Sequence, residues 1–347
     1  MTDLAALVPI GWTERLADAA RAAAVQHPGE PGRVTRVDRG LVNVLTASGA
    51  LRAAIGSDLV ATGDWVLVAE GDDGPVVATV LPRHSAFVRG DPMDGTARNA
   101  QVVATNIDVV FITQALDNGP NLRRLERELV LAFESGAEPV IVLTKADLVA
   151  DAIDVSPVVR TASGAPVIVT SAVTGVGVDD LRGYASSGRT VALIGASGTG
   201  KSTLVNCLVG ADVRATGAVR ARDQRGRHTT TSRELVVLAD GGVLVDTPGL
   251  RAVTLWLADD GLRRAFADIE ARAPACRFDD CAHDQEPGCA VQLAVARGEI
   301  DAARVVHYRD LDAELDRVAV HERDRARVAQ AGRRAPGSSA TRVQPDR

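Results

Sequence analysis

A glycine-rich segment carries the strongest chemical signal in the sequence. Gly195-Ala196-Ser197-Gly198-Thr199-Gly200-Lys201-Ser202-Thr203 matches the pattern G-x-x-x-x-G-K-S, and it lies between an apolar run and a helix-prone segment. Glycines let the backbone wrap around a phosphate with its N–H groups inward, Lys201 can reach terminal phosphates, and Ser202 can ligate magnesium. An ordinary strand-to-helix turn is the alternative. The strand, the lysine and the serine together favour a phosphate loop.

Lysine is rare in this chain, and that rarity points to a second segment. Among 39 Lys and Arg residues, only Lys145 and Lys201 are lysines. Thr144-Lys145-Ala146-Asp147 directly follows an apolar run that reads as a buried strand. Asp147 can accept from both N1–H and the exocyclic amine of guanine, a donor pair that adenine lacks. Helix capping by Asp147 is the alternative, but the unusual lysine favours a guanine site with the stem of Lys145 against the base.

Further polar groups follow other apolar runs. Ser171-Ala172 ends the next strand, where the Ala172 N–H could donate to the guanine carbonyl. Asp246-Thr247-Pro248-Gly249 ends a later strand, so Asp246 could hold magnesium and Gly249 could sense a γ-phosphate. A plain D-x-P-G turn is the alternative. Between these motifs, either Thr229 or Thr230 could complete the magnesium shell, and we favour Thr230.

A Cys and His cluster indicates a metal site near the C-terminal third. Cys276, Cys281, His283 and Cys289 fall within fourteen residues. Three cysteines and one histidine form a closed tetrahedral zinc set without an open catalytic position, although the spacing is not that of a simple CxxC finger. Buried cysteines beside a loop histidine are the alternative. Cys207, in the helix after the phosphate loop, is expected to be a core residue.

The bulk composition limits the class of protein. A chain of 347 residues is long enough for two or three domains, and 46% hydrophobic residues support packed cores. The net charge of -6 and 3% aromatic content argue against a uniformly basic binder that stacks bases. We see neither a signal region nor an apolar stretch of roughly 18 residues, and the four cysteines do not suggest a disulfide scaffold. We therefore expect a cytoplasmic monomer without membrane contact.

The N-terminal half is predicted to contain a small barrel. Residues 1–32 read as a peripheral helical lead-in, and residues 83–105 as a polar connector, either an exposed linker or a phosphate-backbone contact. Residues 33–82 hold five short β-type runs separated by turns, which fits a closed barrel of the OB type or another small barrel. The predicted strands are 34–37, 41–45, 58–60, 65–68 and 76–80.

The remaining chain alternates strands and helices. From residue 106 to 256, apolar strands alternate with helices, which predicts a doubly wound α/β sheet with ligands at the carboxyl ends of its strands. Asn121 is expected to cap one helix, and residues 234–238 and 242–245 read as a hairpin. Residues 257–330 read as a helical domain around the cysteine cluster, beginning with a helix over 257–271. The basic end, 331–347, is expected to be disordered, with contact to a nucleic-acid backbone as the sharper possibility.

The order of these motifs is unusual. In ordinary GTPases the phosphate loop comes first and the guanine motif late, whereas here Thr144–Asp147 and Ser171-Ala172 precede Gly195–Thr203. With this circular permutation, and with Asn121–Arg127 and Gly226–Thr231, the sequence resembles the ribosome small-subunit-dependent GTPase A (RsgA) family. The resemblance implies an OB barrel, a permuted GTPase domain that binds GTP and GDP with Mg²⁺, and a structural zinc domain. It also implies GTP hydrolysis during late maturation of the small ribosomal subunit, with that subunit and its rRNA as partners.

Two positions depart from the general GTPase pattern. Thr144 stands where Asn is usual, so we expect a looser tie between the guanine motif and the phosphate loop. Leu250 stands where Ras-like enzymes carry a water-orienting Gln, so intrinsic turnover should be slow. His228 is then the candidate catalytic residue, with a structural role in its loop as the alternative. Two other functions stay open: an rRNA-binding module with structural nucleotide, or a GTPase acting on a non-ribosomal partner.

Overall fold

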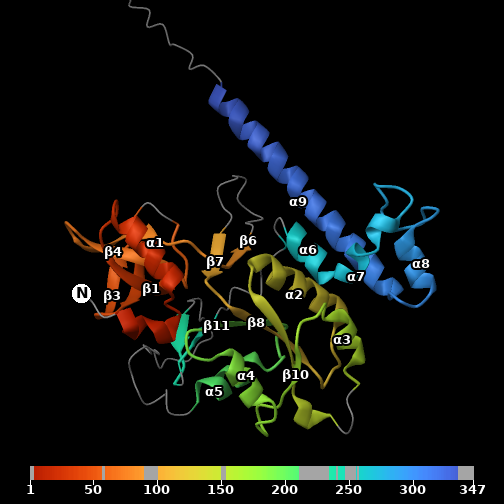
Figure 1. Cartoon of the computed structure of the whole chain (residues 1–347), viewed down its shortest axis with the longest axis horizontal. Helices are drawn as coiled ribbons and strands as arrows, with labels where there is room; N and C mark the ends of the chain where they lie inside the picture. Colours follow the sequence, from red (N-terminus) through yellow and green to blue (C-terminus); the bar gives the residue numbers. More distant parts are fainter. Residues whose placement is uncertain are drawn as a thin grey trace, which may run out of the picture.

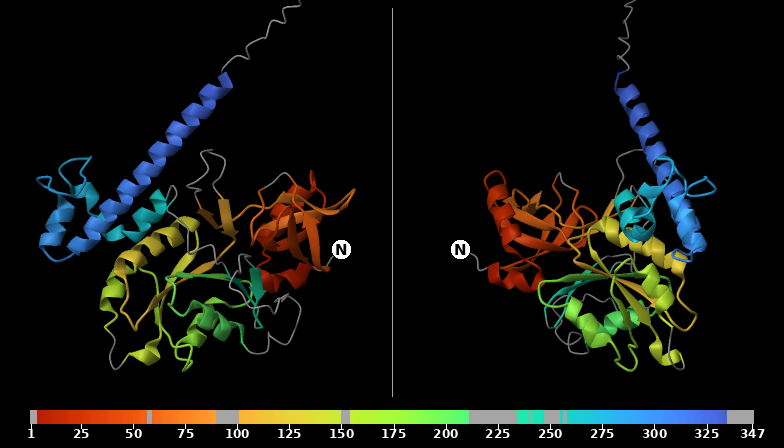
Figure 2. Two further views of the ribbon diagram at one scale, coloured as in Figure 1. Left: turned by 180° about the vertical axis from the view of Figure 1, so that it is seen from behind. Right: turned by 45° about the vertical axis from the view of Figure 1, so that its right-hand side comes forward.

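The structure is a computed structural model with three parts side by side (Figures 1 and 2). It describes residues 4–56, 59–89, 101–149, 154–210, 234–239, 241–246, 255 and 258–334; for Glu234, Asp246 and 321–334 it describes only the backbone. An N-terminal barrel adjoins a central mixed sheet with helices, and a helical C-terminal part follows. The last helix projects beyond the rest of the molecule in both figures.

The barrel has OB-type strand order, as the sequence predicted. Its strands close in the order β1-β2-β3-β5-β4, and the β3–β5 pair that completes the closure is parallel. Small aliphatic side chains fill it, including Val34, Val44 and Val66, because alternate residues of each strand point inward. The strands are β1 (Glu30–Val37), β2 (Leu41–Thr46), β3 (Gly49–Ala54), β4 (Trp65–Gly71) and β5 (Gly74–Val80).

One barrel strand was misplaced by the sequence reading. The third strand is β3, whereas the predicted strand over 58–60 is wrong for Leu59 and Val60, which lie outside any strand. Asp58 lies outside the described residues. The alanine-rich β3 carries few β-branched residues and so gives a weak local signal. Its pairing with β2 along six residue pairs compensates for that weakness.

The N-terminal segment is not peripheral, contrary to the prediction. A 3₁₀ helix (Leu4–Ile10) and α1 (Glu14–Ala24, capped by Thr13) bury Leu7 and Leu16 against the main core. The carbonyl of Pro9 accepts from the N–H groups of Gly188 and Gly242, at 3.0 and 2.9 Å, which belong to two loops of the central domain. The segment therefore joins the barrel to the central sheet.

Arg33 lies at the same junction and is 1% exposed. Its guanidinium donates to the carbonyls of Ile10 and Asn106 and to Thr190 Oγ1 (2.8 Å), and it lies over the Trp65 ring. Burial lowers the pKa of Arg33 to about 10, with Asp108 and Asp64 opposing the shift. One buried cation thus bonds the N-terminal segment, the start of the central domain and a sheet strand.

Part of the predicted polar connector forms a small hairpin sheet instead. β6 (Ala86–Arg89) pairs with β7 (Gln101–Thr105) in antiparallel fashion; 90–100, including Arg98, lie outside the described residues. Arg83 is not an exposed linker residue, because its guanidinium makes a bidentate pair with the buried Asp64 carboxylate, at 2.7 Å for both bonds. Arg83 therefore stabilises the barrel through its ion pair with Asp64.

The central domain is an α/β sheet with six described strands in the order β10-β9-β8-β11-β13-β12. Five are parallel, and β12 pairs antiparallel with β13, which confirms the hairpin. Near-continuous apolar runs form β8, β9 and β11 because both sheet faces are covered by helices. The elements are β8 (Val109–Ala115), α2 (Leu122–Ser135), β9 (Glu138–Thr144), a 3₁₀ turn (Ala146–Leu148), α3 (Ser156–Thr161), β10 (Val167–Val169), α4 (Val178–Tyr184), β11 (Thr190–Gly195), α5 (Lys201–Val209), β12 (Glu234–Val237) and β13 (Val243–Asp246).

The C-terminal part is helical. The helix predicted over 257–271 is broken at Phe266 into α6 (Asp259–Ala265) and α7 (Ala267–Glu270). A 3₁₀ turn (Ala273–Ala275), α8 (Ala290–Ala296) and α9 (Ala302–Arg334) follow, so α9 extends into the segment expected to be disordered. Among the helices that the structure describes, none is both long enough and apolar enough to cross a membrane.

Candidate functional site

Three predicted motifs meet at one edge of the central sheet. β8, β9, β10 and β11 are parallel, so their carboxyl ends share an edge, and each of the three motifs follows one of these ends. Thr144–Asp147 begins at the last residue of β9, Ser171-Ala172 follows β10 after one intervening residue, and Gly195–Thr203 spans the end of β11 and the start of α5. Permuting the chain does not alter this convergence, because the sheet positions of the strands decide which loops are neighbours.

The phosphate loop is closely packed against β8. Gly195 has φ +140°, and a Cβ there would lie 2.2 Å from Thr113 Oγ1, so only glycine fits. Thr113 Oγ1 also contacts Thr199 Oγ1 at 2.7 Å. The Lys201 ammonium donates to the carbonyls of Gly195 (2.9 Å) and Ala196, which holds it across the loop at the beginning of α5. The loop therefore presents a cation and a helix N-terminus at the same place.

Thr144 ties the guanine motif to the phosphate loop, while a looser tie than Asn would give stays a prediction. Its Oγ1 donates to the carbonyl of Thr199 at 2.7 Å, and Thr144 is 4% exposed. A threonine hydroxyl reaches the loop because β9 and β11 flank β8 and their ends lie close together. The shorter side chain of threonine therefore makes a direct bond between the guanine motif and the phosphate loop.

Both charged side chains of the guanine motif have a partner. Ser171 Oγ donates to Asp147 Oδ1 at 2.6 Å, which fixes the carboxylate toward the loop that carries Ala172. The Lys145 ammonium pairs with Asp117 Oδ2 at 2.7 Å, and this bond lowers the pKa of Asp117. Lys145 itself has a left-handed backbone, φ +62°. Asp117 was missed by the sequence reading, although it lies just beyond the end of β8.

A second missed group lies behind the loop, on α2. Glu128 is 6% exposed and accepts from Gln114 Nε2 (3.0 Å) and Arg124 Nε (2.8 Å). Gln114 Oε1 in turn accepts from the N–H of Asn121, the residue that caps α2 as predicted. Thr113 and Gln114 are polar residues at the end of an apolar strand, the same signal that identified the other motifs.

Glu128 should make stability depend on pH. Burial raises its pKa, while the charges of Arg124 and Lys201 oppose the shift. The folded chain therefore holds this proton to higher pH than the unfolded chain, and its contribution to stability is lost as pH rises through the folded pKa. Replacing Glu128 by Gln removes the titration. A one-unit difference in pKa corresponds to about 1.4 kcal/mol.

We therefore expect Glu128→Gln to gain stability relative to the native chain as pH rises from about 4.3, the ordinary pKa of Glu. Denaturant unfolding at several pH values between 4 and 8 measures the difference. A difference that is constant with pH would contradict the raised pKa.

Several predicted residues lie outside the described part of the chain. These are His228, Thr230, Gly249 and Leu250, and for Asp246 only the backbone is described. The backbone nevertheless places Asp246 at the end of β13, beside β11. Ser202 lies in the first turn of α5 and is exposed. The proposed magnesium and catalytic roles therefore stay predictions, while the loop and guanine motifs are in contact.

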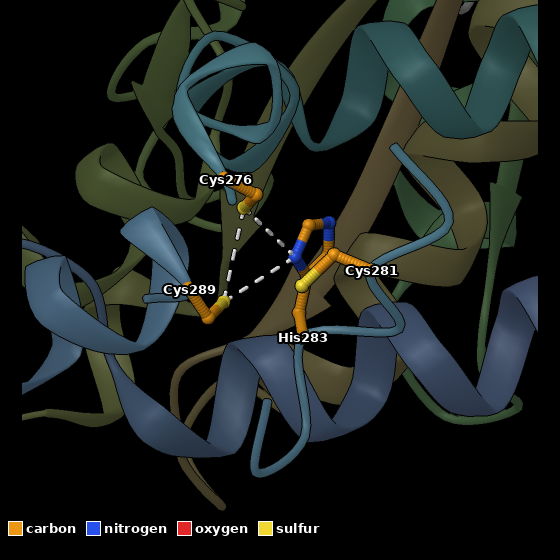
Figure 3. Close-up of side chains that lie close together, drawn as sticks. All are labelled: Cys276, Cys281, His283 and Cys289. Atoms are coloured by element: carbon orange, nitrogen blue, oxygen red, sulfur yellow. Dashed lines mark hydrogen bonds between the residues drawn. The ribbon is translucent and has the colours of Figure 1, made fainter. Parts of the chain in front are cut away.

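The four predicted metal ligands converge (Figure 3). The ligand atoms of Cys276, Cys281, His283 and Cys289 all lie within 4.8 Å of one another. Cys276 Sγ is 3.9 Å from Cys289 Sγ, and each lies 3.6 Å from His283 Nδ1. His283 has φ +57°, and its carbonyl accepts from Gln292 Nε2 at 2.6 Å, so the loop is fixed against α8. This cluster could hold a metal ion.

The pKa values of the cluster are shifted in different directions, and the shifts of Cys276 and His283 favour their metal-binding forms. Burial would raise the pKa of Cys276, but N–H groups of Ala290 and Val291, at the start of α8, lower it below the ordinary value. Burial lowers the pKa of His283. Burial and the neighbouring sulfurs raise the pKa of Cys281 to about 11. Thiolate and neutral imidazole are the metal-binding forms, and a cation would relieve the repulsion among the sulfurs.

Comparison with known proteins agrees with this arrangement. Residues 80–256 match the family model described as RsgA GTPase. The chain is 46% identical to the small ribosomal subunit biogenesis GTPase RsgA of Streptomyces avermitilis, covering 93% of this chain and 89% of that protein. It is 41% identical to the small ribosomal subunit biogenesis GTPase RsgA 2 of Lactiplantibacillus plantarum, covering 84% and 85%.

Solved structures show the same architecture. YjeQ from Thermotoga maritima is 27% identical, with a TM-score of 0.61 over 82% of this chain and 98% of that one. YloQ, described as a circularly permuted GTPase, is 24% identical, with a TM-score of 0.57 over 84% and 96%. The matched fold, the family model and the high identity across most of the chain lead to one conclusion: the chain belongs to the RsgA GTPase family.

Proposed function

We propose that the chain binds guanine nucleotide at the shared sheet edge and hydrolyses GTP there. The observation that carries the proposal is the bond between Thr144 Oγ1 and the Thr199 carbonyl, at 2.7 Å. It joins the motif that can select guanine to the loop that can hold phosphates. The base would be recognised by Asp147, with Lys145 and the Ala172 N–H beside it, and the phosphates by Gly195–Thr203.

The proposed site includes Mg²⁺ and a slow intrinsic reaction. Ser202 and Asp246 follow neighbouring strands, and with Thr230 they would hold the ion, which would neutralise charge on the phosphates. His228 is the proposed catalytic residue, since Leu250 cannot orient water. Without a bound partner, we therefore expect slow hydrolysis.

We propose zinc as the metal of the cysteine cluster, in a structural role. Zn–S bonds are about 2.3 Å long, so a regular tetrahedron has S···S edges of roughly 3.8 Å. The observed 3.9 Å between the sulfurs of Cys276 and Cys289 fits this geometry. Four protein ligands leave no open coordination position, which excludes a water-activating role for this ion.

The proposed partner is the small ribosomal subunit with its rRNA, and the proposed location is the cytoplasm, with the chain as a monomer. The relatives that support this are named for small ribosomal subunit biogenesis. The barrel and the zinc-binding part flank the nucleotide domain on opposite sides in Figure 1, so both could contact one large surface. GTP hydrolysis would then report correct docking.

Nucleotide binding and turnover on the full chain test the proposal. We expect fluorescent GDP to bind at least about a hundredfold tighter than fluorescent ADP, and Lys201→Ala to lose most of that affinity. GTP hydrolysis should accelerate when purified small subunits are added at low salt. Equal affinity for GDP and ADP would overturn the guanine site.

The hydrolysis assay, together with co-sedimentation, distinguishes the two alternative functions. An unchanged rate with small subunits, combined with co-sedimentation, would support an rRNA-binding module with structural nucleotide. An unchanged rate without co-sedimentation would point to a different partner. The native chain and Lys201→Ala are compared in both assays, so a loss of binding is distinguished from a loss of turnover.

A further inference from the structure

Helix α2 lies between the nucleotide site and the C-terminal helices. It packs on β8 and β9 on one side, and against α6 and α9 on the other. The views in Figures 1 and 2 show it running beside α6 and the lower part of α9. Two buried carboxylates, Glu126 and Glu128, are two positions apart on this helix and therefore point about 200° apart around its axis.

Glu128 faces the nucleotide site. As described above, it accepts from Gln114 and Arg124, and Gln114 accepts from the N–H at the start of α2. Thr144 Oγ1 lies 3.3 Å from the Gln114 carbonyl while it donates to the phosphate loop. Three successive polar contacts, through Gln114 and Thr144, thus connect α2 to the loop proposed to hold phosphate.

Glu126 faces α9. Its carboxylate accepts from the Arg304 guanidinium at 2.8 Å and contacts His307 Nδ1, and all three residues are less than a tenth exposed. Arg304 also bonds Asp268 of α7. Leaving any member of such a buried network without its partner is costly, so α9 fixes the position of α2.

More exposed ion pairs extend the contact between α2 and α9. The Arg127 guanidinium makes a bidentate pair with Glu314, 2.7 Å for each bond, and Arg123 pairs with Asp310 at 2.6 Å. Asp310 and Glu314 are four apart on α9, and Arg123 and Arg127 are four apart on α2, so the two helices match along a full turn.

The contact between α2 and α6 is so close that the two helices have little room to shift against each other. A Cβ on Gly261 would lie 2.3 Å from the Val130 carbonyl, so α6 approaches the backbone of α2 directly. The Gly261 N–H donates to Glu134 Oε2 at 2.8 Å. Close packing on one face of α2 and ion pairs on another favour rigid-body movement of this helix over local bending.

We propose that α2 is a positioning helix that couples the seating of α9 to nucleotide affinity, with Glu126 and Glu128 as its contacts on the two sides. The inference rests on the proposed nucleotide site. A partner that pulls α9 away would displace α2, and with it Gln114 and the ties to the phosphate loop. By linkage, bound nucleotide strengthens the contact between α2 and α9 to the same extent.

Charge reversal across the contact tests the coupling. We expect Arg127→Glu and Glu314→Arg each to weaken fluorescent GDP binding by about three- to tenfold, with faster dissociation, and the double variant to recover most of the loss. The matched control is Arg272–Glu299, a pair of similar exposure at 2.8 Å that lies within the C-terminal part. Reversing either control residue should leave GDP affinity unchanged. Metal content and thermal unfolding are measured on every variant.

The nucleotide site and the coupling are contradicted by different outcomes. If Lys201→Ala binds GDP as the native chain does, the nucleotide site is wrong. If Lys201→Ala fails to bind but the contact variants bind normally, or weaken no more than the controls, the coupling is wrong. Should a reversal variant not fold, hydrogen exchange on the native chain decides: GDP should slow exchange in residues 302–320 of α9, and no slowing would overturn the coupling.

Discussion

Asp147→Asn should convert the chain from guanine to xanthine nucleotides. The carboxylate can accept from both guanine donors, and Ser171 Oγ fixes it at 2.6 Å. An amide would place its own N–H₂ against the guanine amine, whereas the carbonyl of xanthine at that position can accept from it. We expect GTP affinity to fall about a hundredfold or more, roughly 2.7 kcal/mol, and XTP affinity to rise.

Competition of unlabelled XTP and GTP against fluorescent GDP or XDP measures this switch. The matched control is Asp154→Asn, an exposed carboxylate in the same domain whose Oδ1 accepts from the N–H of Ser156, the first residue of α3. That variant should keep the native preference for GTP. If Asp147→Asn also keeps it, Asp147 does not recognise the base.

Removing the metal should unfold the segment around the cysteine cluster. Structural zinc contributes on the order of 10 kcal/mol in small zinc domains at neutral pH, more than this loop can replace by packing. Cys289→Ser should have the same effect, because Cys289 is both a proposed ligand and the cap of α8, with its Sγ accepting from the Gln292 N–H at 3.4 Å. We expect a new unfolding transition at lower temperature and one equivalent of zinc lost.

Elemental analysis, circular dichroism and thermal scans before and after chelation measure these effects. Cys207→Ser is the control, since Cys207 lies on α5 and packs at the edge of the central core. It should retain the metal. A Cys289→Ser variant with unchanged zinc content and an unchanged melting curve would contradict the structural role.

Local patterns predicted the parts of the fold that depend on neighbours in sequence. The Asn121 cap, the hairpin of β12 and β13 and the run before each nucleotide motif are all short-range features, and the structure has them. The four proposed metal ligands could be predicted for the same reason, since all of them fall within one loop region. Circular permutation was readable from motif order alone.

Features that depend on distant contacts were missed or misjudged. β3 has a weak strand composition and exists because β2 and β5 pair with it. The hydrogen bond from Thr144 to the phosphate loop depends on the position of β9 relative to β11. The order of strands in the sheet determines that position. Gln114 and Glu128 are 14 positions apart and meet only once α2 folds back on β8. No local spacing rule signals such a pair.

Arg33 makes the barrel and the sheet a single cooperative unit. Its buried guanidinium donates to Ile10, Asn106 and Thr190, so separating the barrel from the sheet would break all three hydrogen bonds at once. The predicted domain border near residue 82 follows the pattern of strands, but it does not separate two units that are stable independently. The chain is therefore a poor candidate for division there into autonomous fragments, and heat should melt the barrel and the sheet together.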